Sequence, residues 1–594
     1  MRLTFPALLV ATLMSASVSL VSVAQADTVA IETHEAEALA PPVEAQSATS
    51  LSGLFLAATL AETERDLPRA AEFYRGLHEL DPSSSRFLQS AFTMELADGR
   101  MTGALDLASL LVAAGDTGVA RLAIALDAMR QRSHRVALRE LEAYQSDGFG
   151  DIVASLVGAW AHYGAGDAEQ GLAILDAMDG PAWVELYASF HAGLIRLANG
   201  DSKEALADLE RAYTADPGAL RLVQGYARGL IANDRKDEAL EVLEGFRMLA
   251  PSNEVIAGDI AAALADQPIS MRVRTAQQGA AEVLYGLGVA LGQDGAEEVG
   301  AIYLNLALFA APEFDLARFG LARTYEGLEL WERAVDVYEG ITDESALKRT
   351  AEIRLGVLLD QLERPDEADA HLEALIEADS SDLNAISTFG TVLRVRRDFE
   401  RAAEVYSMGI ETIEKPTFEH WRLFYQRGIA FERTDRWPLA EADFLKALEL
   451  NEDQPDVLNY LAYTWVDRGE NLDRSVQMLE RAVEMRPDSG YIVDSLGWVY
   501  FRLGRFEDAV EQLERAVILD PTQAVIHDHL GDAYWMVGRR LEARFQWSHA
   551  RDLDDTHDEI DEEAIQRKLQ RGLTRQEVES VGVWPEGYKI PTIQ

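Results

Sequence analysis

A small residue recurs along this chain at intervals of about 34 positions, and this period constrains the fold more than any other feature. The first intervals are 34, 33, 34, 34 and 34, and the period resumes after one gap of 61 and another of 38. The residues are Ala70, Ala104, Ala137, Gly171, Ala205, Ala239, Gly300, Ala334, Ala368, Ala402, Ala440, Ser475, Ala509 and Ala543. A period of this length predicts an array of helix–turn–helix units.

The sequence around each small residue follows a common pattern, which the window 490–523 shows most clearly. Its residues are Leu496-Gly497 and Tyr500 in the first half, then Ala509, Leu513, Ala516 and Pro521 in the second. Small residues at these places let the backbones of two crossing helices approach closely, and larger side chains fill the space around them. The pattern is typical of tetratricopeptide repeats (TPRs). We therefore predict an all-α fold, a right-handed superhelical solenoid of about 14–15 helix–turn–helix repeats.

Two irregularities interrupt the period. One lies at 253–280, where Pro268 would break a helix, and the other lies near 414–417. Loop variation explains both gaps, and so does a division of the array into blocks. The predicted division is an N-terminal block at 51–252, an irregular repeat at 253–280, a middle block at 281–413, a C-terminal block at 414–550, and a capping helix with a tail at 551–594.

The first 26 residues have the features of a secretory signal peptide. Arg2 precedes a mostly apolar run, and Ala24-Gln25-Ala26 fits the small-residue cleavage rule. The alternative is a retained membrane anchor, but serines dilute the apolar run. We predict cleavage before Asp27, a periplasmic location, and a flexible linker or partner-docking arm at 27–50.

Charge and cysteine content exclude several classes of function. The formal net charge is −47, from 101 acidic and 54 basic residues, so the chain should repel nucleic acid and anionic lipid. We expect protein or peptide partners that are basic or amphipathic, and no nucleic acid. There is no cysteine, which excludes disulfides, thiolate metal sites, a cysteine nucleophile and an N-terminal lipid anchor on cysteine.

Motifs for catalysis are absent from the sequence. It contains no H-E-x-x-H and no G-x-S-x-G, and Gly286-Leu287-Gly288 lacks the preceding strand of a nucleotide-binding loop. His527 and His529 flank Asp528, an arrangement that we interpret as helix surface rather than a metal site. The repeats fill nearly all of 51–550, which leaves no room for a catalytic domain. We expect no enzyme activity, no cofactor and no bound metal.

The last three repeats carry the candidate binding residues. In TPR arrays the first helix of each repeat lines the concave groove, and its inward positions here alternate between carboxylates and aromatic rings. The predicted protein-binding residues are Asn459, Tyr463, Tyr491, Asp494, Trp498, Phe501, Asp528, Asp532 and Trp535. Aromatic side chains are enriched at interfaces, and aspartates would favour Lys or Arg on a ligand. The aromatic residues fit an inter-repeat core equally well, whereas a buried unpaired carboxylate would be costly.

Three segments resemble, beyond the general repeat, a family of exported proteobacterial TPR proteins. They are 457–463, 490–498 and 528–535, and the close resemblance covers about residues 418–550. The family includes an outer-membrane lipoprotein that binds a carboxyl-terminal processing protease and brings peptidoglycan hydrolases to it. The resemblance implies an adaptor role, with a periplasmic processing protease and its substrates as partners. The present sequence departs from that lipoprotein because it has no cysteine to carry the lipid.

The leading hypothesis is a non-catalytic periplasmic scaffold or adaptor that binds envelope proteins in the concave groove of the array. The alternative is a structural TPR component of a polysaccharide-export or envelope-assembly complex, in which the array only spaces other subunits. Co-purification with a protease would favour the first hypothesis, and co-purification with glycan-synthesis proteins would favour the second.

Overall fold

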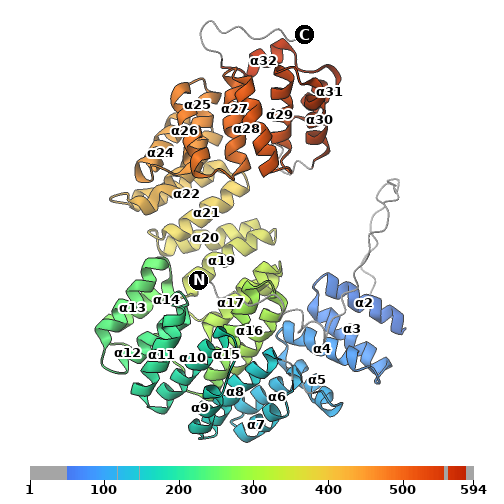
Figure 1. Cartoon of the computed structure of the whole chain (residues 1–594), viewed down its shortest axis with the longest axis vertical. Coiled ribbons are helices and arrows are strands. Elements are labelled where there is room, and N and C mark those ends of the chain that lie inside the picture. Colours follow the sequence, from blue (N-terminus) through green and yellow to red (C-terminus); the bar gives the residue numbers. More distant parts are fainter. Residues whose placement is uncertain (1–49, 117, 146–147, 554–559, 584–594) are drawn as a thin grey trace. The chain divides into compact units, whose positions relative to one another are not determined.

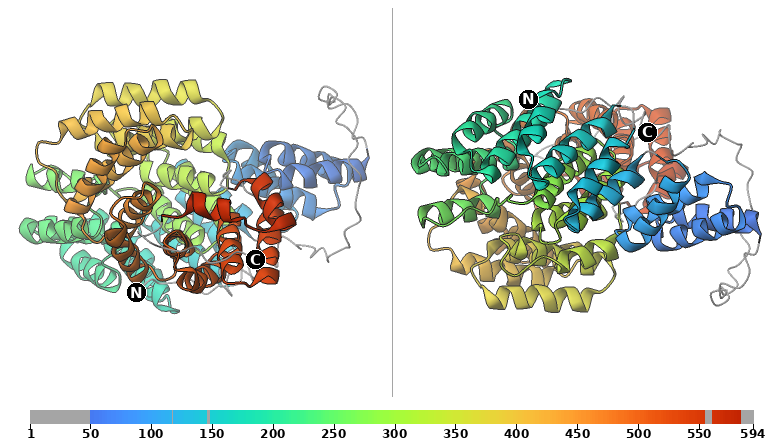
Figure 2. Two further views of the ribbon diagram at one scale, coloured as in Figure 1. Left: turned by 90° about the horizontal axis from the view of Figure 1, so that it is seen from above. Right: turned by 90° about the horizontal axis from the view of Figure 1, so that it is seen from below.

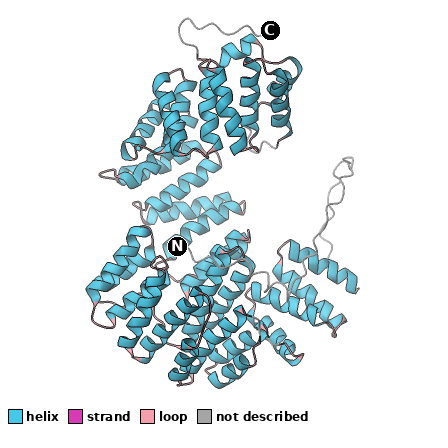
Figure 3. Cartoon of the chain, in the orientation of Figure 1, coloured by secondary structure: helices cyan, strands magenta, loops and turns pink. Residues whose placement is uncertain are grey.

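A computed structural model of the chain describes residues 50–116, 118–145, 148–553 and 560–583. All regular secondary structure in these residues is helical, which confirms the all-α prediction (Figure 3). The predicted signal peptide at 1–26, all but the last residue of the predicted linker, and residues 584–594 of the predicted tail lie outside the described residues. None of the described helices is long and apolar enough to cross a membrane.

The chain divides into two compact units, residues 1–368 (unit 1) and 369–594 (unit 2). The helices of unit 1 are α2 (Leu51–Thr63), α3 (Leu67–Leu80), α4 (Ser85–Ala97), α5 (Met101–Ala113), α6 (Val119–Arg130), α7 (His134–Glu142), α8 (Phe149–Gly164), α9 (Ala168–Asp176), α10 (Ala182–Asn199), α11 (Ser202–Ala215), α12 (Leu220–Ile231), α13 (Lys236–Leu249), α14 (Glu254–Leu264), α15 (Ala276–Gln293), α16 (Glu297–Ala310), α17 (Asp315–Gly327), α18 (Trp331–Glu339) and α19 (Lys348–Gln361). Helix α20 (Pro365–Ala378) contains the boundary, which therefore falls inside the middle block expected at 281–413 and not at 414.

Unit 2 continues the array with its own run of helices. They are α21 (Leu383–Val395), α22 (Phe399–Thr412), the short 3-10 helix η1 (Phe418–His420), α23 (Trp421–Arg433), α24 (Trp437–Leu450), α25 (Pro455–Asp467), α26 (Leu472–Met485), α27 (Gly490–Arg502), α28 (Phe506–Leu519), α29 (Ala524–Met536), α30 (Arg540–Asp552), α31 (Glu562–Arg571) and α32 (Arg575–Val581). Among the described residues, six helix pairs run from α2/α3 to α12/α13 and eight from α15/α16 to α29/α30, in line with the predicted 14–15 repeats (Figure 1).

The periodic small residues lie where the two helices of a pair cross. The first helix of each pair packs on a second helix whose periodic alanine has no exposed surface, as Ala205 and Ala509 illustrate. At two crossings even alanine would be too large. A Cβ on Gly171 would lie 2.5 Å from the carbonyl oxygen of Ala159, and one on Gly300 would lie 2.7 Å from that of Gly288. Close approach of the backbones is thus the physical cause of the period.

The irregular repeat contains one helix, α14, followed by a non-helical segment at 265–275. Side chains in this segment alternate as in an extended chain: Ile269, Met271 and Val273 are buried, while the residues between them are exposed. The backbone N–H of Ser270 donates to Asp259 Oδ1 at 2.6 Å, and Arg228 donates to the carbonyl oxygen of Val273 at 3.2 Å. Side chains of α12 and α14 therefore hold the segment in place of a second helix.

After this segment the chain of unit 1 packs back on its own first repeats. Helix α15 contacts α6 and α8, and α16 contacts α4 and α6. Figure 2 shows the ribbon from above and from below. The contact is close: Gly279 of α15 lies against the indole ring of Trp160, and Gln277 donates to the carbonyl oxygen of Met129 at 2.7 Å. The helix pair α15/α16 thus fills a face of the earlier repeats that an open solenoid would leave to a partner.

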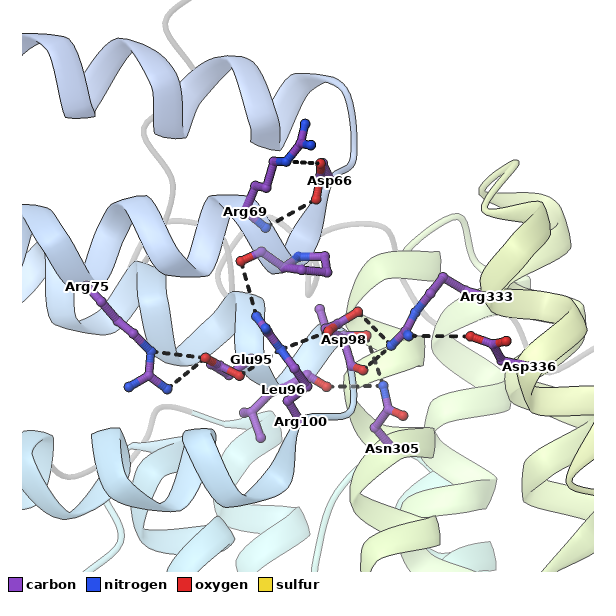
Figure 4. A network of polar contacts seen from close by, with 12 residues as sticks. Asp66, Arg69, Arg75, Glu95, Leu96, Asp98, Arg100, Asn305, Arg333 and Asp336 are labelled. Carbon is purple, nitrogen blue, oxygen red and sulfur yellow. Dashed lines mark hydrogen bonds and ion pairs between the residues drawn. The ribbon is translucent and has the colours of Figure 1, made fainter. Parts of the chain in front are cut away.

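A polar network fixes the end of α4 to α16 and α18 in the same unit (Figure 4). Asn305 donates to the carbonyl oxygens of Leu96 at 3.1 Å and Ala97 at 3.0 Å, which satisfies backbone groups at the helix end. The buried carboxylate of Asp98 pairs with Arg333 at 2.6 Å and with Arg100 at 2.9 Å. These bonds satisfy polar groups that would be costly if buried without partners.

Candidate protein-binding surface

The predicted binding residues occupy equivalent positions on α25, α27 and α29, the first helices of the last three pairs. The fifth residue of each helix is Asn459, Asp494 or Asp528, and the ninth is Tyr463, Trp498 or Asp532. The twelfth residue is Phe501 in α27 and Trp535 in α29. A shared position on successive parallel helices brings these side chains to one seam of unit 2.

Five of the nine predicted residues are buried. They are Asn459, Asp494, Phe501, Asp532 and Trp535. Phe501 and Trp535 are buried, so they pack in the core between repeats and do not face the groove. For Asp494 and Asp532 the expected exposure to a ligand is wrong, because each carboxylate is buried with a partner from its own chain.

The partner of Asp494 is His529 on the next repeat. Its Nδ1 lies 3.0 Å and 3.1 Å from the two carboxylate oxygens of Asp494, and its ring stacks on Trp498 with 4.0 Å between ring centroids. Burial lowers the pKa of His529, but Asp494, Asp528 and Asp532 raise it more, so the pKa lies above its ordinary value. The interaction between the Asp494 carboxylate and the His529 imidazole therefore links two neighbouring repeats.

The partner of Asp528 and Asp532 is Lys568 of α31. Lys568 Nζ lies 2.8 Å from both carboxylate oxygens of Asp528 and 2.9 Å from Asp532 Oδ2, and Trp547 Nε1 donates to Asp532 Oδ1 at 2.9 Å. Burial raises the pKa of Asp532 to about 6, although Lys568 acts in the opposite direction. The cation that the sequence led us to expect on a ligand is thus supplied by the chain itself.

Helices α31 and α32 and the turn between them also contact α29 and α27. A Cβ on Gly572 would lie 1.8 Å from Trp535 Cζ2, so the turn after α31 lies directly on this ring. Further along, Arg502 donates to the carbonyl oxygen of Val581 at 2.6 Å and accepts from the N–H of Val583 through its own carbonyl at 2.8 Å. Helices α31 and α32 therefore form the polar end that an array needs over its final apolar face.

Asn459 differs from Asp494 and Asp528, its equivalents on the next two first helices, because its side-chain amide has no hydrogen-bond partner among the described residues. Its side chain has no exposed surface, and neither Nδ2 nor Oδ1 makes a hydrogen bond to another residue in the described ranges. We predict that Asn459→Leu raises the free energy of unfolding of unit 2 by about 1–3 kcal/mol, because it removes the cost of two buried polar atoms. Urea unfolding measures the change, and a loss of stability would contradict the prediction.

Three of the four remaining predicted residues form a partly exposed surface together with one that the sequence analysis missed. Tyr491 is 58% exposed, and Tyr463 and Trp498 are half-buried. Burial raises the pKa of Tyr425, and the charge of Tyr491 on α27 acts in the same direction. Tyr425 is the fifth residue of α23, so the positional rule applied one repeat earlier would have found it. We call Tyr425, Tyr463, Tyr491 and Trp498 the tyrosine surface.

Comparison with known proteins identifies the repeats. Residues 196–265 and 425–490 match family models described as tetratricopeptide repeat, and residues 497–538 match one described as TPR repeat. The chain contains tetratricopeptide repeats. The chain is 26% identical over 196 residues to the TPR repeat-containing protein PA4667 of Pseudomonas aeruginosa, a match that spans 33% of this chain and 32% of that protein.

Solved TPR structures are similar at low identity. Yeast Tom70 covers 88% of this chain and 95% of its own, at 14% identity and a TM-score of 0.34. The APC/C hetero-tetramer Cut9–Hcn1 covers 76% of this chain and 96% of its own, at 13% identity and a TM-score of 0.30. YrrB, described as a TPR protein with an unusual peptide-binding site, covers 38% and 95%, at 18% identity and a TM-score of 0.23.

Three of the four residues of the tyrosine surface lie within the matched TPRs, and Tyr491 lies between two matches. Tyr425 and Tyr463 fall in the match at 425–490, and Trp498 falls in the match at 497–538. The surface is therefore built from the first helices of successive repeats rather than from the capping helices. Tyrosine and tryptophan supply large contact areas at a low cost in side-chain entropy, which suits this surface to contact with another protein.

Proposed function

We propose that this chain is a non-catalytic protein-binding scaffold or adaptor of the periplasm, and that unit 2 binds its partner on the tyrosine surface. The observation that carries the proposal is that Tyr425, Tyr463, Tyr491 and Trp498, all at least partly exposed, lie at inward positions of three successive first helices, α23, α25 and α27. Clustered aromatic residues that remain partly exposed are the usual centre of a protein interface.

The proposed partner presents a basic or amphipathic segment. The support for a basic segment is the net charge of −47, which steers cations toward the chain. Asp528 and Asp532 add nothing to this preference, since Lys568 already neutralises them. The apolar part of the segment would lie on the rings of the tyrosine surface.

A periplasmic location and an adaptor role for a carboxyl-terminal processing protease extend the proposal. The support for the location is the predicted signal peptide, and the support for the adaptor role is the resemblance of residues 418–550 to the lipoprotein partner of such a protease. Mass spectrometry of the periplasmic fraction should find a mature chain beginning at Asp27. An intact N-terminus at Met1 in the cytoplasm would overturn the location.

Affinity purification from envelope extract tests the binding surface. We expect Tyr491→Ala to reduce the recovery of the main partner at least tenfold, the size of effect that a central aromatic residue has in an interface. Phe545→Ala is the matched control, because Phe545 is an aromatic residue of unit 2 that is 65% exposed on a second helix, α30.

The identity of the partner distinguishes the candidate functions. Recovery of a processing protease that is lost with Tyr491→Ala supports the adaptor proposal. Recovery of polysaccharide-export or envelope-assembly proteins without a protease supports the structural alternative. Equal partner profiles for the wild type and Tyr491→Ala would remove the tyrosine surface from the proposal.

A further inference from the structure

Unit 1 contains a cavity of about 230 Å³ where its first repeats meet the helices that pack back on them. The walls come from α4, α6, α15, α16 and α17, and most of the lining is apolar, including Phe92, Val119, Leu291, Val299 and Ile302. For scale, an engineered apolar cavity of about 150 Å³ stays dry and binds benzene. A space half as large again would accommodate a chain of about eight carbons.

One side of this cavity is polar and reaches solvent. Glu62, Arg65 and Glu298 line it there, and the last two are exposed. Glu62 already accepts a hydrogen bond from Tyr74 at 2.6 Å, and Arg65 donates to the carbonyl oxygen of Leu328. An apolar interior with a few polar groups at its opening is the common form of a site for a small amphiphilic molecule.

The wall also holds the side chains of two tyrosine residues. Tyr303 is only 3% exposed and lines the cavity beside Tyr325, whose hydroxyl donates to the carbonyl oxygen of Ala97 at 2.8 Å. Burial strongly raises the pKa of Tyr303, which keeps the hydroxyl protonated as a donor.

We propose that this cavity binds a hydrocarbon chain of about eight carbons with a small polar head at the opening. The ligand would contact α4 on one side and α16 on the other, so its binding would strengthen the contact between the first repeats and the returning helix pair. The source is either a free medium-chain amphiphile or the end of a lipid acyl chain, and the two share this chemistry.

The proposal can be tested by measuring how N-phenyl-1-naphthylamine, a neutral fluorescent probe of apolar sites, binds to the full-length protein. Straight-chain alcohols serve as competitors. Each added CH₂ should tighten alcohol binding about fourfold, up to about eight carbons, after which the gain should stop. Octanoate and phospholipid vesicles form separate arms. Competition by octanol and octanoate indicates a free amphiphile, whereas competition by vesicles alone indicates an acyl chain of a lipid.

Two substitutions locate the site. Val299→Phe should weaken probe binding at least tenfold because it fills the cavity, while Val395→Phe, at a residue of unit 2 that is 65% exposed, should change it less than twofold. Phe92→Ala enlarges the cavity and should move the optimal alcohol to a longer chain. The proposal is overturned if the wild type binds no probe, if both valine variants bind equally, or if Phe92→Ala leaves the chain-length optimum unchanged.

Discussion

Gly279→Ala is expected to lower the free energy of unfolding of unit 1 by about 3 kcal/mol or more. An added Cβ would lie 1.9 Å from Cδ2 of Trp160. That ring has no room to retreat, because it is fully buried and its Nε1 donates to His191 Nδ1 at 3.1 Å. The methyl group would therefore displace α15 from α8, and overpacking of a dense core costs about 1–3 kcal/mol or more.

Urea unfolding gives the size of this change, and hydrogen exchange in α8 and α15 shows where it acts. Gly292→Ala is the matched control in the same helix, since a Cβ there would meet no atom within 4 Å. This control should stabilise unit 1 by about 0.5–1 kcal/mol, because alanine favours a helix more than glycine does. If both variants gained stability, the close contact between α15 and α8 would be wrong.

Lys568→Met is expected to destabilise unit 2 by about 3–5 kcal/mol at pH 8. The substitution keeps most of the side-chain volume but leaves the carboxylates of Asp528 and Asp532 without their cation. Removing one partner of a buried ion pair costs more than the pair contributes, because a charge then stays buried without compensation. We also expect faster hydrogen exchange in α31, which loses its polar attachment to α29.

The defect of Lys568→Met should shrink in acid. In the wild type the pKa of Asp532 is raised by burial from 3.8 to about 6, so the stability linked to its proton is fully present below pH 3.8 and is lost as the pH rises through about 6. Lys568 lowers this pKa, and its removal moves the loss to higher pH. The difference between variant and wild type should therefore be smaller at pH 5 than at pH 8.

Lys446→Met is the matched control for this effect. Lys446 pairs with Glu449 at 2.8 Å on the surface of unit 2, where solvent screens the pair, so its removal should cost less than about 1 kcal/mol at either pH. A similar loss in Lys568→Met and Lys446→Met would mean that the contacts between α31 and α29 contribute no more than a surface ion pair.

The sequence predicted the helix pairs well because the residues that specify them are close in the chain. Gly300 and Gly288 meet across the turn between α16 and α15, and the spacing of small residues records that contact directly. The candidate site was harder to predict. The positional rule found the seam of Asp494, Trp498 and Asp532, but it could not tell a ligand-facing residue from one facing the next repeat. Both environments require the same polar or aromatic residue types.

The sequence by itself determined the all-α fold, the pairing of the helices and the place where the pairing fails, near 253–280. These features depend on contacts within a repeat or between neighbouring repeats, and a 34-residue pattern encodes them. Only the tertiary structure decided which faces are covered. The hydrogen bond from Asn305 to Leu96 joins residues 209 positions apart, and Lys568 reaches Asp528 from 40 positions away. An apolar or acidic helix face has the same sequence pattern whether its own chain or a partner covers it, so the pattern alone cannot name the occupant.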